Sequence, residues 1–159
     1  MATIDTLLST GLLLKYELEL PRAALPERVI YMTPHFQDWA VDKLMKRKPS
    51  KGTHLSPFYQ MIDRFDAFCR GEFFEANHMF KMLSPKNHSV WEMKTVDVRI
   101  FGYFTKRDCF IAVDGQMKSA LRITERYQKH IGNVVQIRER LGLNWLTGTE
   151  YGDVISNED

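Results

Sequence analysis

The sequence predicts an α+β fold in which a helix hairpin and a C-terminal helix pack on an antiparallel β-meander, with an N-terminal strand extension. Two helix start signals followed by amphipathic stretches predict the hairpin, and short apolar segments separated by polar turns predict the meander. The 159 residues, 44% hydrophobic and 26% charged, have the composition of one globular domain. We expect a single domain over residues 28–146, an extension over residues 1–27 and an acidic tail, loosely held, over residues 147–159.

The N-terminal extension contains one candidate strand. Between residues 12 and 20, leucine and tyrosine alternate with lysine and glutamate, which is the pattern of a half-buried strand. Pro21 ends the pattern. A further short apolar run, residues 28–32, predicts the first strand of the domain itself.

The helix hairpin is predicted from two matching start signals. Thr33-Pro34 and Ser56-Pro57 each place a capping hydroxyl directly before a proline, and proline suits the first turn of a helix. Apolar residues at three-to-four spacing follow each signal, so each helix should bury one face. Pro49 stops the first helix.

The meander is predicted as four short strands, Met79–Leu83, Ser89–Lys94, Val98–Phe104 and Cys109–Val113. Alternate residues of a strand point to one face, so Arg99, Phe101 and Tyr103 should line a single exposed surface. An amphipathic helix from about residue 117 to residue 141 follows the meander.

The overall charge balance, 22 basic against 20 acidic residues, says little about partners, but the distribution is uneven. The segment from Lys81 to Arg107 contains six basic residues and only two acidic ones, and aromatic residues are interleaved with them. This combination suits RNA, because cations contact phosphates and aromatic rings stack on bases. The ordinary alternative is that these residues form a solvated sheet face.

Several kinds of site are not predicted. The sequence contains no glycine-rich phosphate loop, HExxH or GxSxG motif, and its five histidines lack a metal-binding helical spacing. Cys69 and Cys109 stand alone, without a CxxC pair. No apolar run approaches the roughly 20 residues that cross a bilayer, and no leader pattern occurs. We expect no metal, no cofactor and no membrane partner, and a cytoplasmic location.

The order of elements and a set of meander residues resemble the RelE/HigB-like toxin superfamily and, within it, the phage-derived Gp49-like branch. The residues that carry the resemblance are Lys81, Leu83, Trp91, Glu92, Lys94, Arg99 and Ile100, followed by Phe101 and Phe104. The segment RVIYMTPHFQDWAVDKL resembles the family's first strand and helix, and the likeness covers roughly residues 28–141. It implies the toxin of a type II toxin–antitoxin pair. Such a toxin is a metal-independent endoribonuclease that cleaves mRNA, often on the ribosome, and is neutralised by an antitoxin protein.

The resemblance and the chemistry of RNA cleavage suggest the same residues. When the 2′-hydroxyl of RNA attacks the adjacent phosphate, the reaction needs a base, an acid and cations around the phosphate. Arg99 matches the family's strand arginine and is expected to grip the phosphate, with Lys81 and Lys94 adding positive charge. A lysine here acts as a base only if crowded cations depress its pKa. Tyr103 is expected to stack on a base or donate a proton.

Further basic residues are expected to bind RNA outside the reacting centre: Lys86, Lys106, Arg107, Lys118 and Arg122. The chain also departs from the family's pattern, because no terminal strand with arginine and tyrosine or histidine follows the last helix, and Lys94 stands where arginine is commoner. Two alternatives therefore remain. One is a non-catalytic protein of the same fold, like the ParE toxins that inhibit gyrase, and the other is a phage-derived accessory protein with neither activity. The oligomeric state is left open.

Overall fold

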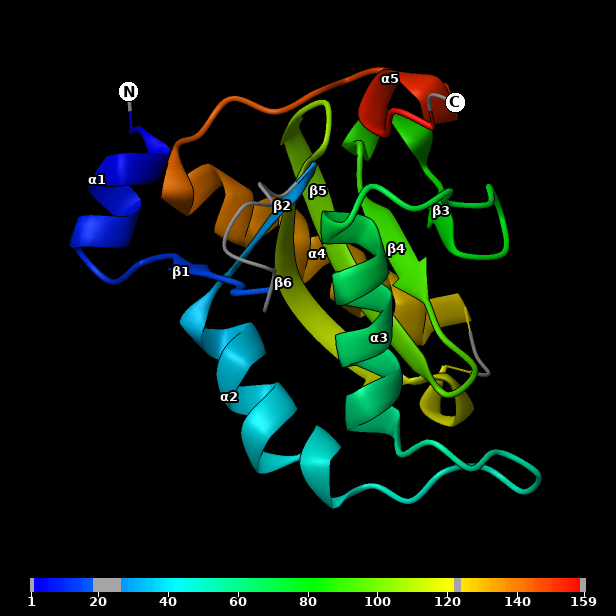
Figure 1. Ribbon diagram of the computed structural model, residues 1–159. Coiled ribbons are helices and arrows are strands. Elements are labelled where there is room, and N and C mark those ends of the chain that lie inside the picture. The colour runs from blue at the N-terminus through cyan, green and yellow to red at the C-terminus, as the bar shows by residue number, and fades with distance from the viewer. Residues whose placement is uncertain (1, 19–26, 122–123, 158–159) are drawn as a thin grey trace.

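The computed structural model describes residues 2–18, 27–121 and 124–157. Its centre is a six-stranded sheet in the order β1-β2-β6-β5-β4-β3, with helices on both faces (Figure 1). The strands are β1 (Leu14–Lys15), β2 (Val29–Met32), β3 (Phe80–Met82), β4 (Trp91–Lys94), β5 (Val98–Lys106) and β6 (Cys109–Met117). The four predicted meander strands are confirmed, with their ends shifted by up to four residues, so the chain has the mixed α+β fold that the sequence predicts.

The sheet is mostly, but not wholly, antiparallel. The strands β3 to β6 follow one another as an antiparallel meander. The strand β2 instead joins β6 in parallel, with Val29 opposite Cys109. A parallel neighbour requires a long crossover connection, and here the two helices and the first three strands of the meander supply it.

The predicted helix hairpin is present as α2 (Pro34–Asp42) and α3 (Pro57–Cys69). Both predicted caps form, because the hydroxyls of Thr33 and Ser56 accept hydrogen bonds from backbone N–H groups at the start of each helix. The first helix ends earlier than predicted and continues as the 3₁₀ turn η1 (Leu44–Lys46). Both helices pack on one sheet face around a buried aromatic core that includes Phe36 and Phe65.

The opposite face of the sheet is covered by α4 (Thr124–Leu141). The expected helix start near residue 117 is instead the 3₁₀ turn η3 (Lys118–Ala120). Under α4, Phe101 stacks on the His130 ring with their centroids 4.8 Å apart. The prediction of an exposed strand face was therefore wrong. Phe101 and Tyr103 are fully buried, because the apolar stripe of α4 packs on that surface, and Arg99 is also buried, with 9% exposed.

The N-terminal extension differs from the prediction. Residues Ile4–Ser9 form a helix, α1, which is capped by Thr3 and buries Leu7. The strand expected over residues 12–20 is reduced to β1, because only Leu14 and Lys15 have ladder partners on β2. The last part of that expected strand lies outside the described residues.

The acidic segment that begins at residue 147 is not loose, contrary to expectation. It contains the short helix α5 (Tyr151–Val154), and Val154 and Ile155 belong to the buried core. The backbone N–H of Ser156 donates a 2.7 Å hydrogen bond to Asp108, and Arg28 donates to the Ser156 carbonyl. Two apolar residues among acidic ones give too little periodicity to predict this packing.

Candidate functional site

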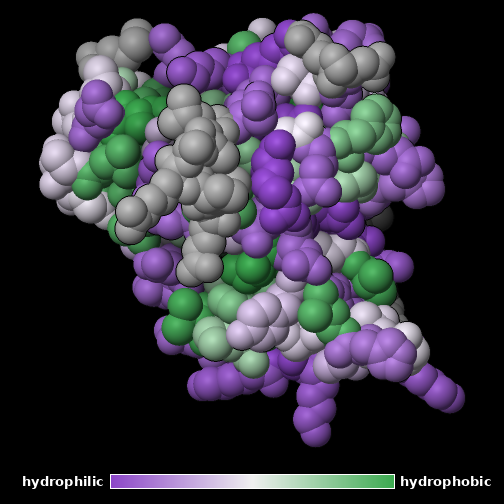
Figure 2. Space-filling view, viewed as in Figure 1, coloured by the Kyte–Doolittle hydropathy of each residue, from purple (hydrophilic) through white to green (hydrophobic). Residues whose placement is uncertain are grey.

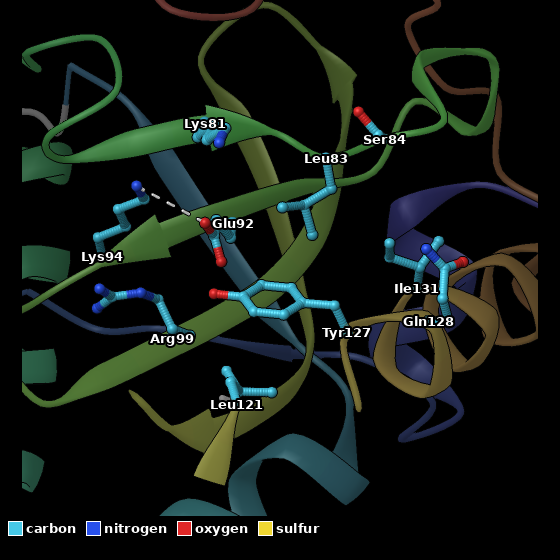
Figure 3. A pocket seen from close by; sticks show the side chains of 10 residues that line it. All are labelled: Lys81, Leu83, Ser84, Glu92, Lys94, Arg99, Leu121, Tyr127, Gln128 and Ile131. Atoms are coloured by element: carbon cyan, nitrogen blue, oxygen red, sulfur yellow. Dashed lines mark ion pairs between the residues drawn. The ribbon is translucent and has the colours of Figure 1, made fainter. Parts of the chain in front are cut away.

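A cavity of about 400 Å³ opens between the strands β3, β4 and β5 and the helix α4 (Figure 3). Its lining residues are Lys81, Leu83, Ser84, Glu92, Lys94, Arg99, Leu121, Tyr127, Gln128 and Ile131. We call it the basic cavity. Three of the four residues predicted to be catalytic, Lys81, Lys94 and Arg99, come together in it.

The register of the sheet explains why these residues meet. Lys81 of β3 lies opposite Glu92 of β4, and Lys94 of β4 lies opposite Arg99 of β5. Glu92 and Lys94 share a face because side chains two positions apart in a strand point the same way. Three adjacent strands thus place three cations and one carboxyl group on one surface.

Glu92 is the most unusual member of this group. It is only 2% exposed, and its Oε2 atom has no hydrogen-bond partner within residues 2–18, 27–121 and 124–157. Its Oε1 atom lies 3.8 Å from the Lys94 ammonium. Burial raises the pKa of Glu92, and the neighbouring cations offset this only in part. A carboxyl group with a raised pKa and a free oxygen beside a cavity is suited to proton transfer.

Lys94 meets the condition for a lysine that exchanges protons. Its ammonium donates a 2.9 Å hydrogen bond to the Asn77 carbonyl. Burial lowers the pKa of Lys94, and Arg99 and Lys81 lower it further, whereas Glu92 acts in the opposite direction. The crowding of cations that the sequence analysis required is therefore present at Lys94.

Arg99 is held rigidly at the edge of the cavity. It is 9% exposed, and its Nη1 atom donates hydrogen bonds to the carbonyls of Thr95, at 2.6 Å, and Val98, at 3.0 Å. Both bonds use the same nitrogen, so neither occupies Nη2. A fixed guanidinium with donors to spare suits an oxyanion such as phosphate.

Tyr127 is a site residue that the sequence analysis missed. Its hydroxyl points between Glu92 and Arg99 (Figure 3). Burial raises the pKa of Tyr127, and the nearby Glu92 raises it further. In the sequence Tyr127 looks like one more member of the apolar stripe of the last helix, so only the packing of α4 on the sheet identifies it.

Tyr103 does not join the site. It is fully buried beneath α4, where the Arg138 guanidinium lies 5.6 Å from its ring centroid, and its hydroxyl has no hydrogen-bond partner in the described part of the chain. The ring has no surface on which a base could stack. The expected contact between Tyr103 and RNA is therefore wrong for this structure, because α4 fills the space that it required.

Two of the predicted RNA-binding residues lie near the basic cavity. Lys86 is exposed in the 3₁₀ turn η2 (Lys86–His88), which follows the cavity residue Ser84. Lys118 is exposed in η3 and close enough to Lys94 to affect its pKa. Arg122 lies outside the described residues.

The other two predicted RNA-binding residues are remote. Lys106 ends β5 and Arg107 follows it in the turn to β6. Seven residues of extended strand separate Lys106 from Arg99, which corresponds to about 23 Å. Neither residue lines the basic cavity. The structure therefore separates this hairpin tip from the group formed by Lys81, Lys94 and Arg99.

Comparisons with protein-family models, with curated proteins and with solved structures find no match. Among the described residues, no three or more histidine, cysteine, aspartate or glutamate side chains are grouped to hold a metal ion. The helices of that same part of the chain include none long and apolar enough to span a membrane.

Proposed function

We propose that this protein is an endoribonuclease that cleaves the RNA backbone in the basic cavity, and that it is the toxin of a type II toxin–antitoxin pair. One observation carries the proposal: in a single cavity, three cations surround a buried carboxyl group, one of whose oxygens has no hydrogen-bond partner among the described residues. The excess of positive charge suits a phosphodiester, and the carboxyl group supplies the proton chemistry that binding alone does not need.

The pKa shifts of Glu92 and Lys94 assign them complementary roles. A raised carboxyl pKa makes Glu92 a stronger base, and a lowered ammonium pKa makes Lys94 a stronger acid. In the reaction Glu92 takes the proton of the 2′-hydroxyl, whose oxygen forms a bond to the adjacent phosphorus. The bond from phosphorus to the 5′-oxygen breaks, and Lys94 gives that oxygen a proton. The products are a 2′,3′-cyclic phosphate and a 5′-hydroxyl.

The remaining cavity residues stabilise and orient the reacting group. Arg99 and Lys81 face the extra negative charge that develops on the phosphate as the new bond forms. Tyr127 lies beside Glu92 and Arg99 and orients them. The apolar wall, which includes Leu121 and Ile131, gives the ribose and its base a surface free of competing charge.

The toxin assignment is supported by the order of the elements. The strand β2, the hairpin of α2 and α3, the four meander strands and α4 follow in the order on which the resemblance to the RelE/HigB-like superfamily rests. In such a pair the partners are an antitoxin protein and mRNA, with the ribosome as a possible platform.

The test combines induction in a tractable bacterium with cleavage of a short RNA by the purified protein. The wild type should arrest growth and create new RNA 5′ ends, and the short RNA should yield the cyclic phosphate. Glu92→Gln should slow cleavage by about 10²–10⁴-fold and Arg99→Ala by about 10²–10³-fold. A 2′-deoxy substitution at the cleaved position should block the reaction.

A matched control is Lys15→Ala, which removes an exposed cation from the far edge strand and should leave cleavage unchanged. Thermal melting of each variant separates loss of activity from loss of folding. DNA damage with intact transcripts would indicate that the protein inhibits gyrase and does not cleave RNA. Normal growth after induction would indicate an accessory protein with neither activity. Full cleavage by Arg99→Ala would refute the assignment of the site.

A further inference from the structure

The connection between α2 and α3 carries a concentrated positive charge. Residues 43–54 include five basic residues and no acidic one, namely Lys43, Lys46, Arg47, Lys48 and Lys51. All five side chains are exposed, and none forms an ion pair with another described residue. Figure 2 shows hydrophilic side chains projecting from the lower end of the molecule, where Figure 1 places this connection. We call residues 43–54 the basic loop.

A groove separates the basic loop from η3. This cavity of about 500 Å³ is lined by Lys48, Ser50, Val96, Asp97, Met117, Lys118 and Ser119. Lys48 and Ser50 form one wall, and Lys118 and Ser119 form the other. We call it the loop groove.

Asp97 holds the two walls of the loop groove in place. Its carboxylate accepts hydrogen bonds from the Ser50 backbone, at 3.1 Å, and from the Gln60 amide, at 2.8 Å. Its backbone carbonyl accepts a 2.7 Å hydrogen bond from the backbone N–H of Lys118. Asp97 is only 7% exposed, so its charge is directed into the protein while the two lysines remain exposed. The groove is therefore both preformed and positively charged.

The loop groove lies next to the basic cavity. Residues 117–119 line the groove and Leu121 lines the cavity, so one short segment borders both. Lys118 is close enough to Lys94 to lower the pKa of its ammonium. Val96, which is 60% exposed on the groove rim, offers an apolar surface to an unstacked base.

We infer that the loop groove and the basic loop bind the sugar-phosphate backbone of single-stranded RNA beside the segment held in the basic cavity. The inference rests on the proposed function for the identity of the ligand. Exposed lysines on the two facing walls of a fixed groove, with further cations on the adjoining loop, attract a polyanion, and an apolar rim accepts a base whatever its identity. The groove thus extends the binding site by several nucleotides without reading sequence.

The experiment measures the affinity of the full chain for 2′-O-methyl RNA, which cannot be cleaved, as a trinucleotide and as a dodecanucleotide. The double variant Lys48→Ala/Lys118→Ala removes one cation from each wall of the groove. For the longer RNA, the slope of log affinity against log salt should flatten by about 1.4. This change corresponds to roughly 25-fold weaker binding at about 0.1 M salt. The trinucleotide, whose phosphates we expect the basic cavity to hold, should bind the double variant as it binds the wild type.

The Lys15→Ala variant is again the matched control and should bind both RNAs normally, and thermal melting confirms that the double variant is folded. Unchanged binding of the longer RNA by the double variant, or equal losses for both lengths, would overturn the inference. If the wild type binds the longer RNA through the groove but cuts no RNA, the proposed function fails while the groove remains. If cleavage depends on Glu92 but the affinity for the longer RNA does not depend on Lys48 and Lys118, only the inference about the loop groove is wrong.

Discussion

Replacing Arg28 by methionine tests the network that fastens the C-terminal segment to the core. Arg28 is only 3% exposed, and its guanidinium packs against the rings of Phe68 and Phe74, at 5.3 Å and 5.7 Å from their centroids. It donates hydrogen bonds to the carbonyls of Phe68, at 3.2 Å, Glu72, at 2.8 Å, and Ser156, at 2.5 Å. Methionine keeps much of the apolar contact but removes all three of these hydrogen bonds. The Phe68 carbonyl still accepts a hydrogen bond from the Gly71 backbone, whereas the other two carbonyls lose the donor that Arg28 supplies.

The expected cost follows from those contacts. A hydrogen bond from a charged group contributes about 1.5–3 kcal/mol, and the retained apolar burial of methionine offsets part of the sum. Removing one partner from a buried ionic contact costs about 3–5 kcal/mol, and Arg28 also pairs with Asp108 at 3.4 Å. We therefore expect the Arg28→Met variant to lose about 3–5 kcal/mol of unfolding free energy. For a domain of this size the Tm should fall by roughly 6–20 °C.

Urea and thermal denaturation measure this loss, and hydrogen exchange should show faster exchange in α5. The matched control is Arg70→Met, because the Arg70 side chain is 48% exposed and, among the described residues, bonds only to the exposed Glu72. Exposed ion pairs of this kind contribute little to the free energy of unfolding, so the control variant should have the same Tm as the wild type. The reasoning is refuted if Arg28→Met also melts like the wild type, or if both variants lose equal stability.

Two further predictions concern residues of the sheet face under α4. Tyr103→Phe removes a buried hydroxyl that forms no hydrogen bond with a described residue, so it should raise the unfolding free energy by about 1 kcal/mol in urea titration and leave RNA cleavage unchanged. Lost cleavage would show that Tyr103 reaches the substrate. Because folding raises the pKa of Glu92, the wild type should lose stability as pH rises from about 4.5 toward that raised value, whereas Glu92→Gln should not. Denaturation across pH checks this, and a pH-independent difference between the two proteins would contradict it.

Local signals in the sequence predicted most of the elements correctly. The two helix caps depend only on a hydroxyl followed by proline, so Thr33 and Ser56 were found without knowledge of the fold. Signals of this kind span only a few residues. The resemblance and the chemistry of RNA cleavage selected Lys81, Lys94 and Arg99, and the structure brings these three side chains together in one cavity.

The errors concern contacts between distant segments. Strand alternation predicts that Tyr103 faces solvent. In the structure it is buried, because α4, which begins some twenty residues later in the chain, packs over it. Glu92 was part of the resemblance, but its role depends on burial, which strand alternation does not reveal. Tyr127 and the buried pair Val154 and Ile155 likewise gain their importance only from the surfaces on which they pack.

The parallel pairing of β2 with β6 sets the order in which the fold can be completed. Val29 lies opposite Cys109, 80 positions further along the chain, so β2 has only β1 beside it until β6 has been synthesised. Closing such a long connection is entropically costly and slow compared with forming a hairpin. Dividing the chain between α3 and β6 would leave two fragments, neither with a complete sheet. The aromatic residues of each fragment would stay exposed to solvent until the two fragments associated.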